Sequence, residues 1–154
     1  MCDATSARIL AEKYIDYQPR TSAEVRRRLA KAGFDAEIVD SVVDDLERAG
    51  LLDDSKFSAD WVESRTRTKK LGRIRLASEL RARGVRREDA EGAIQSIDSE
   101  TELASALALA KKKHPLDSPL DRDEKRRLTA YLQRRGFNWE IIEQVFARLL
   151  TNMD

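Results

Sequence analysis

The stretch Glu79-Leu80-Arg81-Ala82-Arg83-Gly84-Val85 places a leucine four residues before a glycine, inside a basic segment. The same spacing recurs in Leu29-x-x-x-Gly33 and Leu132-x-x-x-Gly136, so the three glycines lie about 50 residues apart. Apolar residues also recur at fixed distances before and after each glycine: Val25, Leu76 and Leu128; Phe34, Val85 and Phe137; Leu46, Ile97 and Leu149. The pattern predicts three copies of one helical unit.

Composition points to helices throughout. The chain has 154 residues, of which 41% are hydrophobic and 37% charged, with only three prolines and six glycines. This composition favours an all-α protein, and no strand or hairpin pattern competes with it. We therefore predict a tandem array of three three-helix repeats, about nine helices, with boundaries at residues 1–51, 52–97 and 98–154. Because a repeat of this size has a small core, stacking between repeats should supply part of the stability.

Helix ends are marked along the chain. Pro19 and the glycines at 33, 50, 72, 84 and 136 are expected to end or break helices, and residues 114–119 form a loop with two prolines. The expected N-caps are Thr21 or Ser22, Asp35, one of the pair Asp53-Asp54, Asp121 or Asp123, and Asn138.

Catalytic and metal chemistry find no support. The single Cys2 excludes an internal disulfide, and the single His114, expected at a helix end, has no second imidazole for a metal pair. No nucleophile elbow or phosphate-binding glycine loop occurs. Asp53-Asp54 is the one carboxylate pair that could suggest a metal site, but an N-cap with a favourable first-turn charge explains the pair better. We predict a protein that is not an enzyme and uses no cofactor or metal.

Targeting signals are also missing. The N-terminal residues carry Asp3 and no apolar core, unlike a signal peptide. The longest apolar run, 103–110, is far shorter than the roughly 20 residues that span a bilayer. We expect a cytoplasmic protein without a membrane partner, and a monomer, since nothing demands a dimer.

Charge is segregated although the net charge is only +1. Residues 65–87 hold ten basic residues against the single acid Glu79, and basic residues also cluster at 20–31 and 125–135. Acidic residues gather at 35–54 and 88–102. Basic helices that recur in equivalent places predict a stripe that meets phosphates or an acidic protein surface. The alternative is a solvated surface laced with ion pairs between helices.

The candidate partner-binding or DNA-binding residues are the basic side chains of the first two repeats. They are Arg26, Arg27, Arg28, Arg65, Arg67, Lys69, Lys70, Arg73, Arg75, Arg81 and Arg83. The aromatic residues, in contrast, fall on apolar stripes or just after a glycine, and they are expected in the core rather than in a base-stacking platform: Tyr14, Tyr17, Phe34, Phe57, Trp61, Phe137 and Phe146.

Several of these residues together resemble the RecX family. The resemblance rests on Gly50-Leu51-Leu52-Asp53-Asp54-x-x-Phe57, followed by Arg65, Gly72 and Glu79-Leu80-x-x-x-Gly84-Val85. It extends to Arg20-x-Ser22-x-Glu24, Leu29, Tyr131-Leu132, Arg134 and Gly136-Phe137, and covers about residues 8 to 150. Two departures are Ser58, where the family usually has alanine, and Gln18-Pro19, where a basic residue is common.

The resemblance implies an elongated, curved array of three-helix repeats that regulates bacterial recombination and DNA repair, including the SOS response. Such proteins lie in the groove of the RecA–DNA filament and limit its ATPase, strand-exchange and coprotease activities. The implied partners are therefore the RecA nucleoprotein filament and single- or double-stranded DNA. Two other interpretations stay open from the residues alone: a helix-turn-helix-like protein that binds DNA without RecA, for which the short turns at Gly33 and Gly84 are suitable, and a protein-interaction scaffold that ignores nucleic acid.

Overall fold

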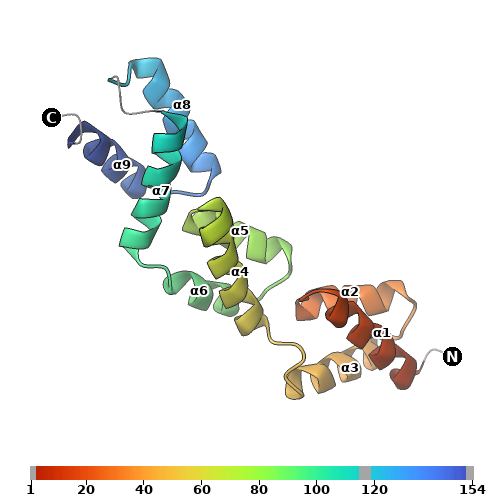
Figure 1. Ribbon diagram of the computed structural model, residues 1–154. Helices are drawn as coiled ribbons and strands as arrows, with labels where there is room; N and C mark the ends of the chain where they lie inside the picture. The colour runs from red at the N-terminus through yellow and green to blue at the C-terminus, as the bar shows by residue number, and fades with distance from the viewer. Residues whose placement is uncertain (1–2, 115–118, 152–154) are drawn as a thin grey trace. The chain divides into compact units, whose positions relative to one another are not determined.

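The computed structural model describes residues 3–114 and 119–151, and every regular element in these ranges is an α-helix (Figure 1). In chain order they are α1 (Ala4–Tyr17), α2 (Ser22–Lys31), α3 (Ala36–Arg48), α4 (Asp54–Lys69), α5 (Arg73–Ala82), α6 (Arg87–Gln95), α7 (Ser99–Lys113), α8 (Arg122–Arg134) and α9 (Trp139–Thr151). The all-α prediction is confirmed, and the nine helices of the described chain fall where the sequence pattern placed them.

The repeated leucine–glycine spacing has a structural cause at the helix C-termini. Gly33 has a positive φ of 95°, its N–H donates to the carbonyl of Ala30, and the N–H of Phe34 donates to the carbonyl of Leu29. This pair of hydrogen bonds is a Schellman motif, in which the leucine is the third residue from the helix end and the residue after glycine is apolar. Gly84 and Gly136 end α5 and α8 in the same way. The pattern that predicts the repeat is therefore a helix-stop signal, and Leu46 and Gly50 end α3 with the same pair of bonds.

Two helix starts use reciprocal capping. The Thr21 Oγ1 accepts the Glu24 N–H at 3.1 Å, and the Glu24 Oε1 accepts the Thr21 N–H at 3.0 Å. Asp121 and Glu124 make the same pair of bonds at the start of α8, so Asp121 rather than Asp123 is the cap. Each capping box satisfies two backbone donors that a helix N-terminus otherwise leaves free. The predicted cap Asp35 occupies the N-cap position of α3 without a side-chain hydrogen bond.

The chain divides into two compact units, and unit 1 consists of residues 1–60 and 80–92. Its core is formed where α1, α2 and α3 pack together. The buried residues of this core are Ala7, Ala11, Val25, Leu29, Val39, Val42, Val43, Leu46 and Leu52. The segment 80–92 is tied to α2, because the Thr21 hydroxyl donates to the Arg83 carbonyl at 2.7 Å. A Cβ added to Gly84 would lie 2.4 Å from the Ala23 Cβ, so a glycine is needed where these backbones meet.

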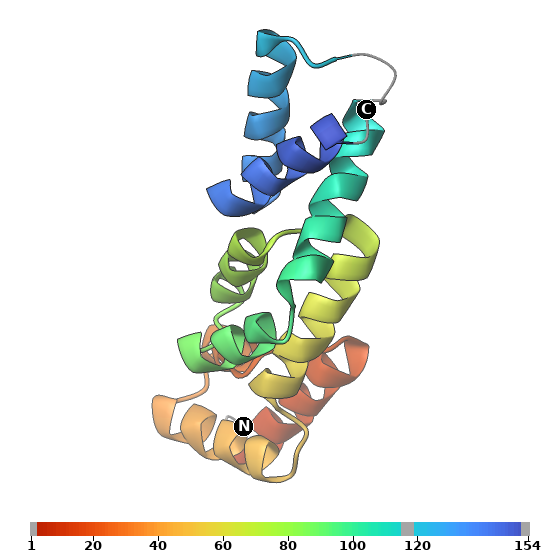
Figure 2. The same cartoon turned by 90° about the vertical axis from the view of Figure 1, so that its left-hand side faces the viewer.

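Unit 2 consists of residues 61–79 and 93–154. Its core lies among α7, α8 and α9, and Figure 2 shows α9 crossing α7. The buried residues of this core include Leu103, Leu109, Leu128, Leu132, Phe137, Ile142, Val145 and Leu149. The start of α5 and the residue before it join this core through backbone contacts. The Gly72 N–H donates to the Arg135 carbonyl at 2.8 Å, and the Ile74 N–H donates to the Gly136 carbonyl at 3.1 Å.

Most of the aromatic predictions agree with the structure, but Tyr17 does not. Phe57 and Phe137 are buried, and Trp61 is half-buried. Tyr17 is 83% exposed, so the prediction that it lies in the core is wrong. Tyr17 is the last residue of α1, and the buried residues of this helix, Ala7 and Ala11, lie well before it. His114 is the C-cap of α7, as expected, whereas Cys2 and part of the two-proline loop lie outside the described residues.

Candidate nucleic-acid interface

The eleven candidate basic residues separate into two groups. Five make ion pairs with carboxylates of their own unit: Arg26, Arg65, Arg73, Arg75 and Arg83. Within the described part of the chain, the other six make no ion pair: Arg27, Arg28, Arg67, Lys69, Lys70 and Arg81. The two groups are intermixed along the sequence, so charge counting alone does not separate them.

In unit 1, Arg83 has a structural role. Its Nη2 lies 3.0 Å from both carboxylate oxygens of Glu24, and its Nε donates to Glu24 at 3.2 Å. The Arg83 side chain is 23% exposed and its guanidinium lies 5.0 Å from the centroid of the Phe57 ring. Two-pronged contact with a half-buried carboxylate fixes an arginine in one orientation. Arg26 makes a more exposed ion pair, through a single nitrogen, with Asp40 on α3.

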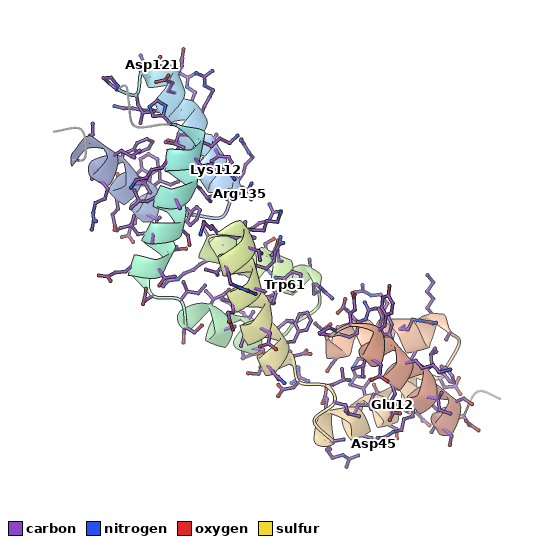
Figure 3. All side chains as sticks on the ribbon, in the orientation of Figure 1. Glu12, Asp45, Trp61, Lys112, Asp121 and Arg135 are labelled. Carbon is purple, nitrogen blue, oxygen red and sulfur yellow. The ribbon has the colours of Figure 1, made fainter. Side chains whose placement is uncertain are left out.

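In unit 2, the Glu79 carboxylate accepts hydrogen bonds from two side chains and lies near a second cation. The Arg65 Nη2 and Nε lie 2.7 and 3.0 Å from its two carboxylate oxygens, and the Trp61 indole N–H donates to it at 3.1 Å (Figure 3 labels Trp61 on α4). The Arg75 Nε is 3.6 Å away. Burial acts to raise the pKa of Glu79, but the hydrogen bonds and the charges of Arg65 and Arg75 outweigh it, so the pKa lies below its ordinary value. The lone acid of the basic segment therefore ties α4 to α5.

Arg73 is also bound within unit 2. The buried Glu102 of α7 accepts the Arg73 backbone N–H at 2.8 Å, and its other oxygen lies 4.0 Å from the Arg73 Nε. The Arg73 side chain also donates to the Ile97 carbonyl. These contacts fix the start of α5 against the start of α7, which is a structural use of the charge.

The cations that make no ion pair in the described chain are exposed, except for Arg28, which is half-buried. In unit 1 they are Arg27 and Arg28 on α2 and Arg81 near the end of α5. In unit 2 they are Arg67, Lys69 and Lys70, where α4 ends, and all three are exposed. Solvated cations exchange their counterions readily for the phosphates of a nucleic acid or the carboxylates of a protein.

The Asp53-Asp54 pair has a helix-capping role. The Asp53 Oδ1 accepts the Lys56 N–H at 3.1 Å, while the Asp54 Oδ1 accepts the Ser22 N–H at 2.9 Å. Burial raises the pKa of Asp54, and the neighbouring charges of Asp89 and Glu47 add to this effect. Asp53 thus caps α4, as predicted, and Asp54 joins α4 to the start of α2.

Metal-binding clusters and membrane-spanning helices are both absent from the described residues. Among residues 3–114 and 119–151, no three histidine, cysteine or acidic side chains gather closely enough to hold a metal ion. No helix within those same limits is long and apolar enough to cross a membrane.

Three family models match consecutive parts of the chain. They are the first three-helix domain of RecX at residues 7–46, the second at 53–94 and the third at 100–146. Regulatory protein RecX of Mycolicibacterium vanbaalenii is 37% identical over 95% of this chain and 83% of its own length. Regulatory protein RecX of Pelodictyon phaeoclathratiforme is 33% identical over 96% of this chain and 91% of its own length.

Solved structures show the same fold. The crystal structure of RecX from Lactobacillus salivarius superposes with a TM-score of 0.87 at 21% identity, covering 96% of each chain. A second crystal structure of a regulatory protein RecX gives a TM-score of 0.83 at 23% identity, over 94% of this chain and 71% of the other.

Proposed function

This chain belongs to the RecX family of regulatory proteins, and from that premise we propose that it binds the RecA–DNA filament and inhibits its activities in recombination and repair. The observation that carries the proposal is the match of all three RecX domains, in order, along nearly the whole chain. The activities concerned are ATP hydrolysis, strand exchange and coprotease action. The protein acts in the cytoplasm as a binding protein without chemistry of its own.

The proposed mechanism is bridging. The helical repeats span neighbouring RecA protomers, and the unpaired cations contact filament DNA or acidic protein surface. Arg27 and Arg28 would make such contacts from unit 1, and Arg67, Lys69 and Lys70 from unit 2, because their charges are not neutralised by carboxylates of the described chain. Each phosphate contact releases condensed counterions, so binding should weaken steeply as salt is raised.

The decisive test is ATP hydrolysis by RecA on single-stranded DNA, with this protein titrated well below one copy per RecA protomer. Strong inhibition at that ratio is expected, because one bound copy would affect several protomers. Unchanged hydrolysis at stoichiometric amounts would contradict the proposal. Tight, sequence-selective binding to naked duplex in the same experiment would favour a helix-turn-helix-like DNA-binding function instead.

A further inference from the structure

An open groove in unit 1 combines exposed aromatic surface with basic charge. Its volume is about 220 Å³, and it is lined by Leu10, Lys13, Tyr14, Tyr17, Arg20 and Arg28. All the charged side chains that line it are basic. It lies where the end of α1 meets the loop before α2 and the exposed side of α2 itself.

The aromatic rings are organised by Arg20. Its guanidinium lies 3.9 Å from the centroid of the Tyr14 ring and 5.9 Å from that of Tyr17. Its Nε also donates to the Tyr14 carbonyl at 3.2 Å, which fixes the side chain against the end of α1. Cation–π attraction at these distances holds the arginine beside the rings. Nevertheless, the Tyr17 side chain stays 83% exposed, so most of its ring is available to a ligand.

Charge in the groove is not neutralised by the surrounding acids. Lys13 is exposed, Arg28 is half-buried, and neither makes an ion pair within the described residues. The nearby acid Glu12 is bound by Arg8 at 2.8 Å, and Glu24 is bound by Arg83 at 3.0 Å. Asp16 is exposed on α1 and does not line the groove. The groove therefore attracts an anion that also offers a flat, stackable surface.

We propose that this groove is a binding site for single-stranded nucleic acid. Tyr17 stacks on a base, while Lys13 and Arg28 contact the adjacent phosphates. Single strands suit the site because their bases are free to stack on a protein ring, whereas the bases of a duplex are stacked on one another. The inference deepens the proposed function and rests on it for its biological setting, but the binding itself requires no RecA.

The test is fluorescence anisotropy of a labelled oligothymidylate of about 16 nucleotides with the full chain, in the absence of RecA. Tyr17→Ala should weaken binding about tenfold, within the range of alanine substitutions at base-stacking aromatics. Tyr17→Phe keeps the ring and should bind within about twofold of the wild type. Because Tyr17 is exposed, neither change should alter helicity by circular dichroism.

Two comparisons separate base stacking from phosphate binding and from nonspecific binding to exposed aromatic surface. An abasic oligonucleotide of the same length should bind the wild type as weakly as the normal oligonucleotide binds Tyr17→Ala, because it offers phosphates without bases. Trp139→Ala removes another exposed aromatic residue, 57% exposed and in unit 2, and should leave binding unchanged. Unchanged affinity in Tyr17→Ala, or equal binding of abasic and normal strands, would overturn the proposal.

RecA-dependent ATP hydrolysis distinguishes this inference from the proposed function. Oligonucleotide binding that depends on Tyr17, together with no inhibition of RecA, would refute the proposed function and support the groove. Inhibition that is lost in Tyr17→Ala while oligonucleotide binding is retained would overturn the groove as a nucleic-acid site and identify it as a protein contact.

Discussion

Replacing Gly72 by alanine should break the contact that joins the start of α5 to the turn after α8. Gly72 does not have a positive φ, so the substitution introduces no backbone strain. The added Cβ would lie 2.4 Å from the Gly136 carbonyl oxygen and 2.8 Å from the Phe137 Cδ1. Backbone and a buried ring cannot yield locally, so the two segments must separate.

The expected cost follows from the contacts that separation breaks. Two backbone hydrogen bonds, from Gly72 to Arg135 and from Ile74 to Gly136, contribute about 1 kcal/mol each. Poorer packing around Phe137, which is 2% exposed, adds a further cost of about 1 kcal/mol. We therefore expect unit 2 to lose about 2–4 kcal/mol of stability.

Amide hydrogen exchange measures this loss at the site. Protection of the Ile74 amide should fall about 30-fold or more in Gly72→Ala, and the urea midpoint followed by circular dichroism should decrease. Gly92→Ala is the matched control, because Gly92 lies inside α6 and an added Cβ meets nothing within 4 Å. The control should raise stability by about 0.5–1 kcal/mol. Unchanged Ile74 protection in Gly72→Ala would refute the reasoning.

Two further predictions concern single side chains. The folded-state pKa of Glu79 lies below its ordinary value of 4.5, so the stability that this group contributes is present above pH 4.5 and is lost as pH falls through the folded pKa. Glu79→Gln should remove this part of the acid dependence of stability in urea melts. An unaltered dependence of stability on pH in the variant would contradict the prediction. Asp121→Ala removes the α8 capping box and should cost about 1 kcal/mol of stability in the same melts, whereas Asp123→Ala, which changes a residue that does not cap, should cost measurably less.

The helices were predictable because their stop signals are local. The Phe34 N–H donates to the Leu29 carbonyl and the Gly33 N–H to the Ala30 carbonyl, so the Schellman motif lies within six consecutive residues. The role of Gly72 was not predictable from its neighbours, because the backbone it meets at Gly136 is far away in the sequence. The sequence pattern predicted that Gly72 breaks a helix, but it did not predict that Gly72 lies close to the Gly136 backbone.

The candidate site was predictable as a basic region, but not in its detail. Arg65 and Arg67 are two residues apart and equally charged, yet Arg65 is bound by Glu79 while Arg67 is exposed without an ion pair in the described chain. One signal was available: Glu79 is the lone acid of residues 65–87, and an isolated acid among many cations tends to collect them. Tyr17 was misplaced because helical spacing from Tyr14 does not show where the covering helices end.

The most direct measurement is RecA ATP hydrolysis on single-stranded DNA with two fourfold charge-reversal variants. One changes the unpaired candidates Arg27, Arg67, Lys69 and Lys70 to glutamate. The other makes the same charge change at exposed cations outside the candidate set, namely Lys56, Lys111, Lys112 and Arg148. We predict that the wild type and the second variant inhibit hydrolysis while the first does not, with all three equally helical. Equal inhibition by both variants, or none by the wild type, would contradict the account.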